Sequence, residues 1–190
     1  MISLIGTRPA IQVGRHQVIQ YDTHWLDIAL RRAATAADRH DFPFVDDIRR
    51  GIEHYLETKC PLRLLPLSDL YDRMRHMLVR IGCESIAEKL EPLAPPITLC
   101  LIRCAKDAGN GFELAFFAQL RSELADLRAS GAEDVRFTGL RDAAQVLVAT
   151  EKWDSRCEQV LSEIRNFLGG IDREHRHFRR PLRLHLEADR

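Results

Sequence analysis

A proline-rich segment in the middle of the chain, Glu91-Pro92-Leu93-Ala94-Pro95-Pro96, constrains the fold more than any other feature. A residue that precedes proline avoids helical backbone angles, so no helix is expected to run through this segment. It leaves about 90 residues on either side, which is close to the usual size of a small domain. The sequence therefore predicts two domains, residues 1–91 and residues 97–190.

The composition is that of a globular protein, with 45% hydrophobic and 29% charged residues. The formal net charge is zero, so no overall field attracts nucleic acid, and nucleic acid is an unlikely partner. No apolar run approaches the roughly 20 residues of a membrane span, and the first residues lack the flanks of a signal peptide. We expect a cytoplasmic protein with no membrane association.

The first half reads as a β-hairpin followed by three or four helices. Gly14-Arg15-His16 provides a turn between two short apolar runs. Helical spacing of apolar residues then recurs, interrupted by a connector that contains Pro61 and Pro66. The expected elements are an edge strand at 2–5, strands at 11–13 and 18–21, a helix capped by Asp22 or Thr23, a helix from Val45, a connector at 60–66, a helix capped by Ser68 or Asp69 and ended by Gly82, and a helix at 84–90.

The second half reads as a small α/β domain in which a few strands pack on two or three helices. The run 97–102 is apolar on both faces, which favours a buried strand. The expected elements after it are a loop at 103–111, a helix at 112–129, a strand at 134–138, a helix or strand at 140–150 with helix favoured, a helix at 153–168 ended by Gly169-Gly170, and a half-exposed strand at 182–186. The whole chain is thus predicted to be α+β.

Several segments of the first half together resemble the ATP-cone, over about residues 10–90. The resemblance lies in the order and spacing of five features: a hairpin, an aromatic residue followed by Asp, a first helix, a third helix that begins after Ser-Asp, and an Ile-Ala pair. The matching segments are Val18-Ile19-Gln20-Tyr21-Asp22, Leu26 with Leu30-Arg31-Arg32-Ala33, Ser68-Asp69-Leu70, and Ile81-Gly82 through Ile86-Ala87.

The resemblance implies a regulatory module that binds ATP or dATP with Mg²⁺ under the hairpin and changes how chains associate. The ligand would then lie near Arg15, His16, Trp25 and Tyr71. The chain departs from the family pattern in the hairpin turn. The family's basic pair and the Asp-Gly that follows it fall on Val13-Gly14-Arg15-His16, which leaves one arginine, displaced by two positions. The family's phosphate-binding lysine falls on Trp25, and its Thr and His near the third helix fall on Leu67 and Tyr71.

These departures leave two readings of the first domain open. Arg8, Arg15 and Arg31 could replace part of the missing positive charge that a triphosphate requires. Alternatively, the module is degenerate, and Trp25 and Tyr71 complete a hydrophobic core, as buried aromatic residues usually do.

We therefore predict a non-catalytic regulatory or partner-binding protein, with a nucleotide, a protein partner or a second copy of the chain as its partner. One alternative is an enzyme whose site lies near 106–111, where a strand of the second domain meets its long helix. Gly109-Asn110-Gly111 fits neither GxGxxG nor the P-loop pattern, so a simple connector is favoured there. Another alternative is an oligomerisation or scaffold module without a ligand.

Cysteine and histidine residues give no strong metal or catalytic signal. Cys100 and Cys104 are expected on one face of a strand, more as small buried residues than as a metal or redox pair. His175 and His177 could share a metal, although a solvated linker is the more common meaning of such a segment. No GxSxG or HExxH motif is present, and we predict no metal site and no catalytic residue.

Overall fold

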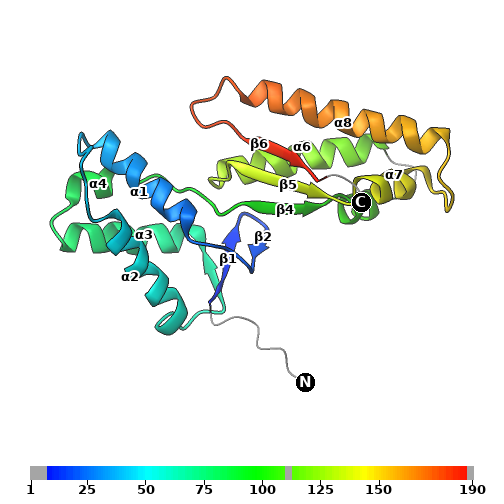
Figure 1. Cartoon of the computed structure of the whole chain (residues 1–190). Helices are drawn as coiled ribbons and strands as arrows, with labels where there is room; N and C mark the ends of the chain where they lie inside the picture. Colours follow the sequence, from blue (N-terminus) through cyan, green and yellow to red (C-terminus); the bar gives the residue numbers. More distant parts are fainter. Residues whose placement is uncertain (1–7, 110–112, 188–190) are drawn as a thin grey trace. The chain divides into compact units, whose positions relative to one another are not determined.

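The computed structural model describes residues 8–109 and 113–187 and shows the α+β fold that the sequence predicts (Figure 1). The chain divides into two compact units, Met1–Pro95 and Pro96–Arg190. The first unit contains β1 (Ala10–Val13), β2 (His16–Val18), α1 (His24–Ala36), α2 (Val45–Thr58), β3 (Leu64–Pro66), α3 (Leu67–Arg80) and α4 (Glu84–Lys89). The second contains β4 (Ile97–Cys100), α5 (Leu101–Ala108), α6 (Glu113–Ala129), β5 (Asp134–Thr138), α7 (Leu140–Val148), α8 (Ser155–His175) and β6 (Arg183–Leu186).

The sheet of the first unit has the strand order β2-β1-β3. The predicted hairpin is present: β1 and β2 are antiparallel, and Gly14 takes a φ of +57° in the turn between them. The second strand starts at His16, two residues earlier than predicted, because Val13 pairs with His16 across a two-residue turn. The prediction of a plain connector at 60–66 is wrong, since β3 forms there and pairs in parallel with β1.

The helices of the first unit begin and end close to the expected residues. Asp22 accepts a hydrogen bond from the backbone N–H of His24 through Oδ1 at 2.9 Å, which satisfies a free donor at the start of α1. The third helix starts at Leu67, before the predicted cap, and Gly82 follows its end with a φ of +77°. Their apolar stripes form one core, which includes Leu26, Leu30, Ile52, Leu56, Leu70, Met74, Leu78 and Ile86. Burial of each such side chain contributes roughly 1.5–3 kcal/mol to stability.

The sheet of the second unit is parallel throughout, with the order β4-β5-β6. A helical segment connects each strand to the next, α5 and α6 first and then α7 and α8. Connections between parallel strands are almost always right-handed. Two right-handed connections that advance in the same direction place their helices on the same face, and Figure 1 shows α6 and α8 on one side of this sheet.

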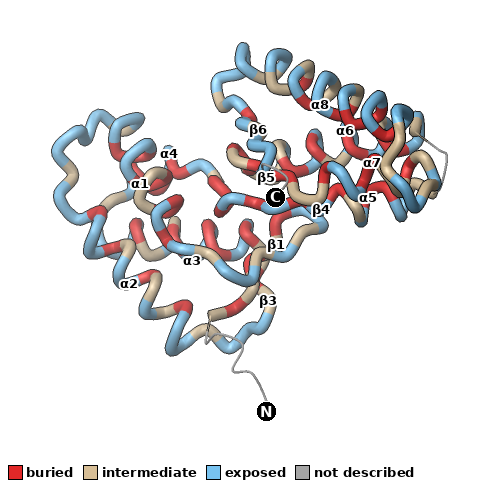
Figure 2. Tube along the Cα trace, turned by 45° about the vertical axis from the view of Figure 1, so that its right-hand side comes forward, coloured by how far each residue is buried: buried red, intermediate tan, exposed pale blue. Residues whose placement is uncertain are grey.

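Burial along the strands follows from this one-sided arrangement. Ile97, Leu99, Val135 and Phe137 are at most 3% exposed and pack toward the helices, and Figure 2 shows buried residues in red. The alternate residues Thr98 and Arg136 are exposed. The sheet therefore has one covered face and one open face among the described residues.

Three predictions for the second unit are wrong. Residues 103–108 belong to α5, which follows β4 without a loop, so Cys104 lies on a helix and does not share a strand face with Cys100. Helix α8 continues through Gly169 and Gly170 to His175, because neither glycine leaves helical angles. The ambiguous segment at 140–150 is helical, as favoured, and the unit has four helices where two or three were expected.

Two predicted features lie outside the described residues: the edge strand at 2–5, and the segment 110–112 with Phe112 at the start of the long helix. Within the described ranges, no helix is long and apolar enough to cross a membrane.

Candidate functional site

The two aromatic residues predicted to touch a nucleotide lie together inside the first unit. Trp25 is 3% exposed and Tyr71 is 0% exposed, and their ring centroids are 6.4 Å apart. The Trp25 indole N–H donates to the carbonyl oxygen of Asp22 at 2.8 Å. The Tyr71 hydroxyl donates to the carbonyl oxygen of Leu93 at 3.0 Å and accepts from the N–H of the same residue at 2.9 Å. Both rings thus have internal polar partners, as residues of a core do.

The two basic residues predicted for the same site lie in the hairpin. Arg15 is exposed in the turn, and His16 is half-buried at the start of β2. The structure therefore brings the aromatic pair together in the core and places the basic pair near the surface.

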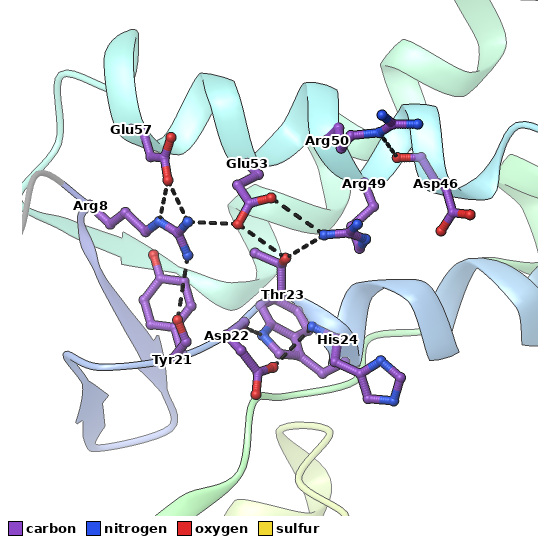
Figure 3. A network of polar contacts seen from close by, with 11 residues as sticks. Arg8, Tyr21, Asp22, Thr23, His24, Asp46, Arg49, Arg50, Glu53 and Glu57 are labelled. Atoms are coloured by element: carbon purple, nitrogen blue, oxygen red, sulfur yellow. Dashed lines mark hydrogen bonds and ion pairs between the residues drawn. The ribbon is translucent and has the colours of Figure 1, made fainter.

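A network of charged side chains lies beside the start of α1 (Figure 3). Glu53, on α2, accepts from the Arg8 guanidinium at 2.6 Å and from Arg49 at 3.3 Å, one on each carboxylate oxygen. Arg49 also donates to the Thr23 hydroxyl at 3.1 Å. Arg8 pairs in addition with Glu57, and this hydrogen bond raises the pKa of the guanidinium above its ordinary value.

This network lines a pocket of about 610 Å³, within the range usual for small-molecule sites. The lining residues come from the segment before β1, from the start of α1 and the two residues before it, and from the first three turns of α2: Arg8, Asp22, Thr23, His24, Asp27, Asp46, Arg49 and Glu53. Four carboxylates face two guanidiniums, so the pocket has a formal charge of −2 with His24 neutral.

One carboxylate oxygen in the pocket wall lacks a hydrogen-bond donor. Oδ1 of Asp27 is buried and has no partner among the described residues, whereas Oδ2 accepts from Arg31 at 2.9 Å. A buried acceptor without a donor costs roughly 1–3 kcal/mol. Such unsatisfied groups are rare in folded proteins and often mark functional positions.

The residues of the pocket suit a nucleotide that is bound to Mg²⁺ better than a nucleotide without a metal ion. A triphosphate needs cations at close range, and four carboxylates oppose it. Mg²⁺ is normally bound through one or two carboxylates and the phosphates of its substrate, and it keeps several waters that donate to further carboxylates. Ribose hydroxyls also donate to carboxylates. The set of donors and acceptors therefore fits a ligand that carries its own divalent cation.

Sequence reasoning named Arg8 as a possible substitute cation but missed Arg49. Arg8 lies in the pocket, whereas Arg31 is exposed and pairs with Asp27. Arg49 is followed by Arg50 in a helix with many charged residues, and helical periodicity alone shows only that both lie off the apolar stripe. The distinguishing signal is three-dimensional, because the partner of Arg49 is Thr23, on the preceding helix boundary.

In the second unit, helices begin at the carboxyl ends of β4 and β5, close to the position of the alternative enzymatic site, of which residues 110–111 lie outside the described residues. α5 begins directly after β4, and α7 begins after Gly139, the single residue that separates it from β5. A Cβ at Gly139 would lie 2.7 Å from the Ile102 side chain, so this turn packs closely against α5. Ligand crevices in open α/β sheets form where the strand order reverses, and the order β4-β5-β6 has no reversal.

The histidine pair at the end of α8 is not accompanied by further metal ligands. His175 is half-buried, and burial together with the nearby Arg128 lowers its pKa. His177 is exposed two residues later. In the part of the chain that the structure describes, no group of three or more His, Cys, Asp or Glu residues could hold a metal ion.

Comparisons with protein-family models, curated proteins and solved structures gave no match to this chain.

Proposed function

We propose that this protein is a non-catalytic regulatory protein whose first unit is an ATP-cone-like module that binds ATP or dATP with Mg²⁺. The observation that carries the proposal is the polar pocket beside the start of α1. It combines two guanidiniums, a hydroxyl and several carboxylates in a cavity large enough for a nucleotide. The bound nucleotide would regulate partner binding or association of the chain.

The roles of the pocket residues follow from their chemistry. Arg8 and Arg49 would contact phosphate oxygens, because a guanidinium forms paired hydrogen bonds with them. Glu53 already holds both guanidiniums within hydrogen-bond distance and orients them. Asp27 and Asp46 would accept from metal-bound water or ribose hydroxyls. The proposal places the ligand next to the start of α1 and does not require the buried rings of Trp25 and Tyr71.

Ligand binding must compete with the existing ion pairs. Arg8 and Arg49 each have a carboxylate partner, so a phosphate has to share or replace that partner. Because the carboxylates outnumber the guanidiniums, the free nucleotide is expected to bind poorly. The magnesium complex reduces the repulsion between phosphate and carboxylate.

Thermal unfolding with ATP, dATP or ADP, each with Mg²⁺ and with EDTA, tests the proposal. A ligand at about 100 times its dissociation constant adds about 2.7 kcal/mol to the stability of the state that binds it. For a unit of this size the midpoint of unfolding should rise by roughly 4–8 °C. The rise should require Mg²⁺.

Adjacent arginines on α2 provide a matched pair of variants. Arg49→Ala should abolish the shift, because Arg49 lines the pocket. Arg50→Ala should preserve it, because Arg50 is exposed and pairs with Asp47 outside the pocket. Loss of the shift only in Arg15→Ala would place the ligand under the hairpin turn instead. Absence of any shift with all three nucleotides would refute nucleotide binding.

A further inference from the structure

The open face of the second sheet is unusual for parallel strands. Parallel sheets are normally covered by helices on both faces, and their strands are apolar throughout. Here β5 alternates between Val135 or Phe137 on the covered face and Asp134 or Arg136 on the other. Because both connections lie on the same side, no element that the structure describes in this unit covers the second face. The protein must therefore expose this face or cover it with something else.

The polar residues of this face stand in register on adjacent strands. Arg136 on β5 is directly opposite His185 on β6, and Asp134 is opposite Arg183. Asp134 accepts from the Arg183 guanidinium at 2.7 Å through one oxygen and pairs with His185 at 3.2 Å through the other. These three side chains thus satisfy one another within the face.

Two opposite charges on the same face remain without a partner. The side chains of Arg136 and Glu187 make no hydrogen bond or ion pair with any residue that the structure describes. Both line a pocket of about 530 Å³, together with Asp134, Arg183, His185 and Pro96. The side chain of Glu187 follows the same alternation as Arg183 and His185. The register places Arg136 and Glu187 diagonally across two neighbouring strands, with their Cα atoms roughly 8 Å apart.

We propose that the open face of β4-β5-β6 is the contact surface for a second copy of this chain, related to the first by a two-fold axis. In a two-fold contact each patch meets its own copy, so the patch must be self-complementary. One unpaired guanidinium and one unpaired carboxylate meet that requirement, because Arg136 of each copy faces Glu187 of the other. A highly acidic or basic partner is less well matched, since the four charged residues of the face sum to zero.

The size and polarity of the face set the expected affinity. Three strands of four or five residues, spaced about 4.8 Å apart with a rise of about 3.3 Å per residue, present a flat area of only roughly 200 Å². Stable interfaces bury about 800 Å² on each partner. The contact should therefore be weak, with a dissociation constant in the micromolar to millimolar range, and it should weaken further with added salt.

Sedimentation velocity of the full chain and its charge-reversal variants tests this contact. Wild type should dimerise as its concentration rises to about 1 mM at low salt. Arg136→Glu should be monomeric, since it places two carboxylates opposite each other at both ends of the contact. Glu187→Arg should also be monomeric, for the same reason with guanidiniums. Arg103→Glu is the matched control, because Arg103 is exposed on α5, away from the sheet, and should leave dimerisation unchanged.

An equimolar mixture of the two single variants gives the decisive result. Arg136→Glu and Glu187→Arg chains should form a heterodimer, because the two-fold contact then pairs a carboxylate with a guanidinium at both ends. Three results would each overturn the proposal: a wild type that stays monomeric at every concentration, a dimer that survives both reversals, or a mixture that stays monomeric. Arg136→Gln and Glu187→Gln, which remove the charge without reversing it, should each weaken the dimer by a smaller factor and guard against misfolding of the reversed variants. This proposal does not depend on nucleotide binding by the first unit.

Discussion

The pocket beside α1 and the open face of the second sheet both combine arginines with carboxylates, but they differ in how far these charges neutralise one another. In the pocket, Arg8 and Arg49 share Glu53, and Arg8 has Glu57 as well. On the sheet face, Arg136 has no partner among the described residues. A surface whose charges are paired internally can bind a ligand only by rearranging those pairs. A surface with unpaired charges can bind without that cost.

The difference assigns distinct roles to the two surfaces. The pocket has enough volume and enough polar groups for a small molecule. Its affinity depends on whether the ligand's own groups can replace the existing ion pairs. The sheet face is small and self-complementary in charge, which suits a weak contact between copies.

The alkylation rates of two cysteines, Cys100 and Cys104, should differ by the largest factor of any prediction. Their comparison reports whether the sheet face is open. Cys100 is exposed on that face, whereas burial, and secondarily Glu123, raises the pKa of Cys104 to about 12. The thiolate is the reactive form, so Cys104 is both shielded and protonated at neutral pH. At pH 8, iodoacetamide should modify Cys100 at least about a hundredfold faster than Cys104. Peptide mass spectrometry would measure both rates, and equal rates would show that the face is covered or that α5 is not packed.

The raised pKa of Cys104 also has a consequence for stability at alkaline pH. Between the ordinary thiol pKa of 9.0 and about 12, the unfolded chain loses the proton while the folded chain keeps it. Folding then becomes less favourable as the pH rises, and this contribution is constant below pH 9. Cys104→Ala should flatten the fall in stability over that range, as urea denaturation at a series of pH values would measure.

Tyr71→Phe should destabilise the first unit by about 2 kcal/mol, because it leaves both the N–H and the carbonyl oxygen of Leu93 without their partner in a buried position. Tyr55→Phe is the control. Its hydroxyl accepts from Arg73 at an exposed position, so its loss should cost less than about 0.5 kcal/mol. Urea denaturation measures both changes. Equal costs would mean that Tyr71 is not held in the core as described.

Gly139→Ala should destabilise the second unit by about 1–2 kcal/mol. The residue takes a φ of +71°, and the added Cβ would meet Ile102 at 2.7 Å. Gly169→Ala should act in the opposite direction and stabilise by about 0.5–1 kcal/mol, because Gly169 lies in α8 with nothing within 4 Å of its Cβ position. If both substitutions stabilise, the close turn between β5 and α7 is misplaced.

Long apolar periodicity predicted most of the fold. The stripes of α1, α2 and α6 extend over several turns, so helical spacing is distinguishable from that of a strand. The elements that were predicted wrongly are short, or they contain residues with a low propensity for the structure that they adopt. β3 follows Pro61 and ends at Pro66, and its pairing with β1 depends on a partner about 50 residues earlier. Helix α8 retains Gly169 and Gly170 because the flanking residues Leu168 and Ile171 are buried, and their packing outweighs the weak helical propensity of glycine.

The candidate surfaces were less predictable than the fold. Charged residues at 8, 22–27 and 46–53 look like ordinary solvent-facing positions until the helices bring them together. Sequence reasoning selected Trp25 and Tyr71 from a family pattern, and the structure places both in a core. The open face can be recognised in the sequence of one strand. Residues 134–138 alternate in polarity, which is not typical of a parallel strand with two covered faces.

Two double-mutant cycles, carried out at a dilution where the chain is monomeric, test the difference between the two surfaces most directly. The Arg49–Glu53 cycle should give a coupling energy of about 0.5–1.5 kcal/mol, since this pair is part of a shared network and is only about a quarter exposed. The Arg136–Glu187 cycle should give a coupling energy within error of zero, because the two side chains do not pair within one chain. A coupling of similar size in both cycles would contradict the account, since Arg136 and Glu187 would then neutralise each other and no charge would remain for a second copy.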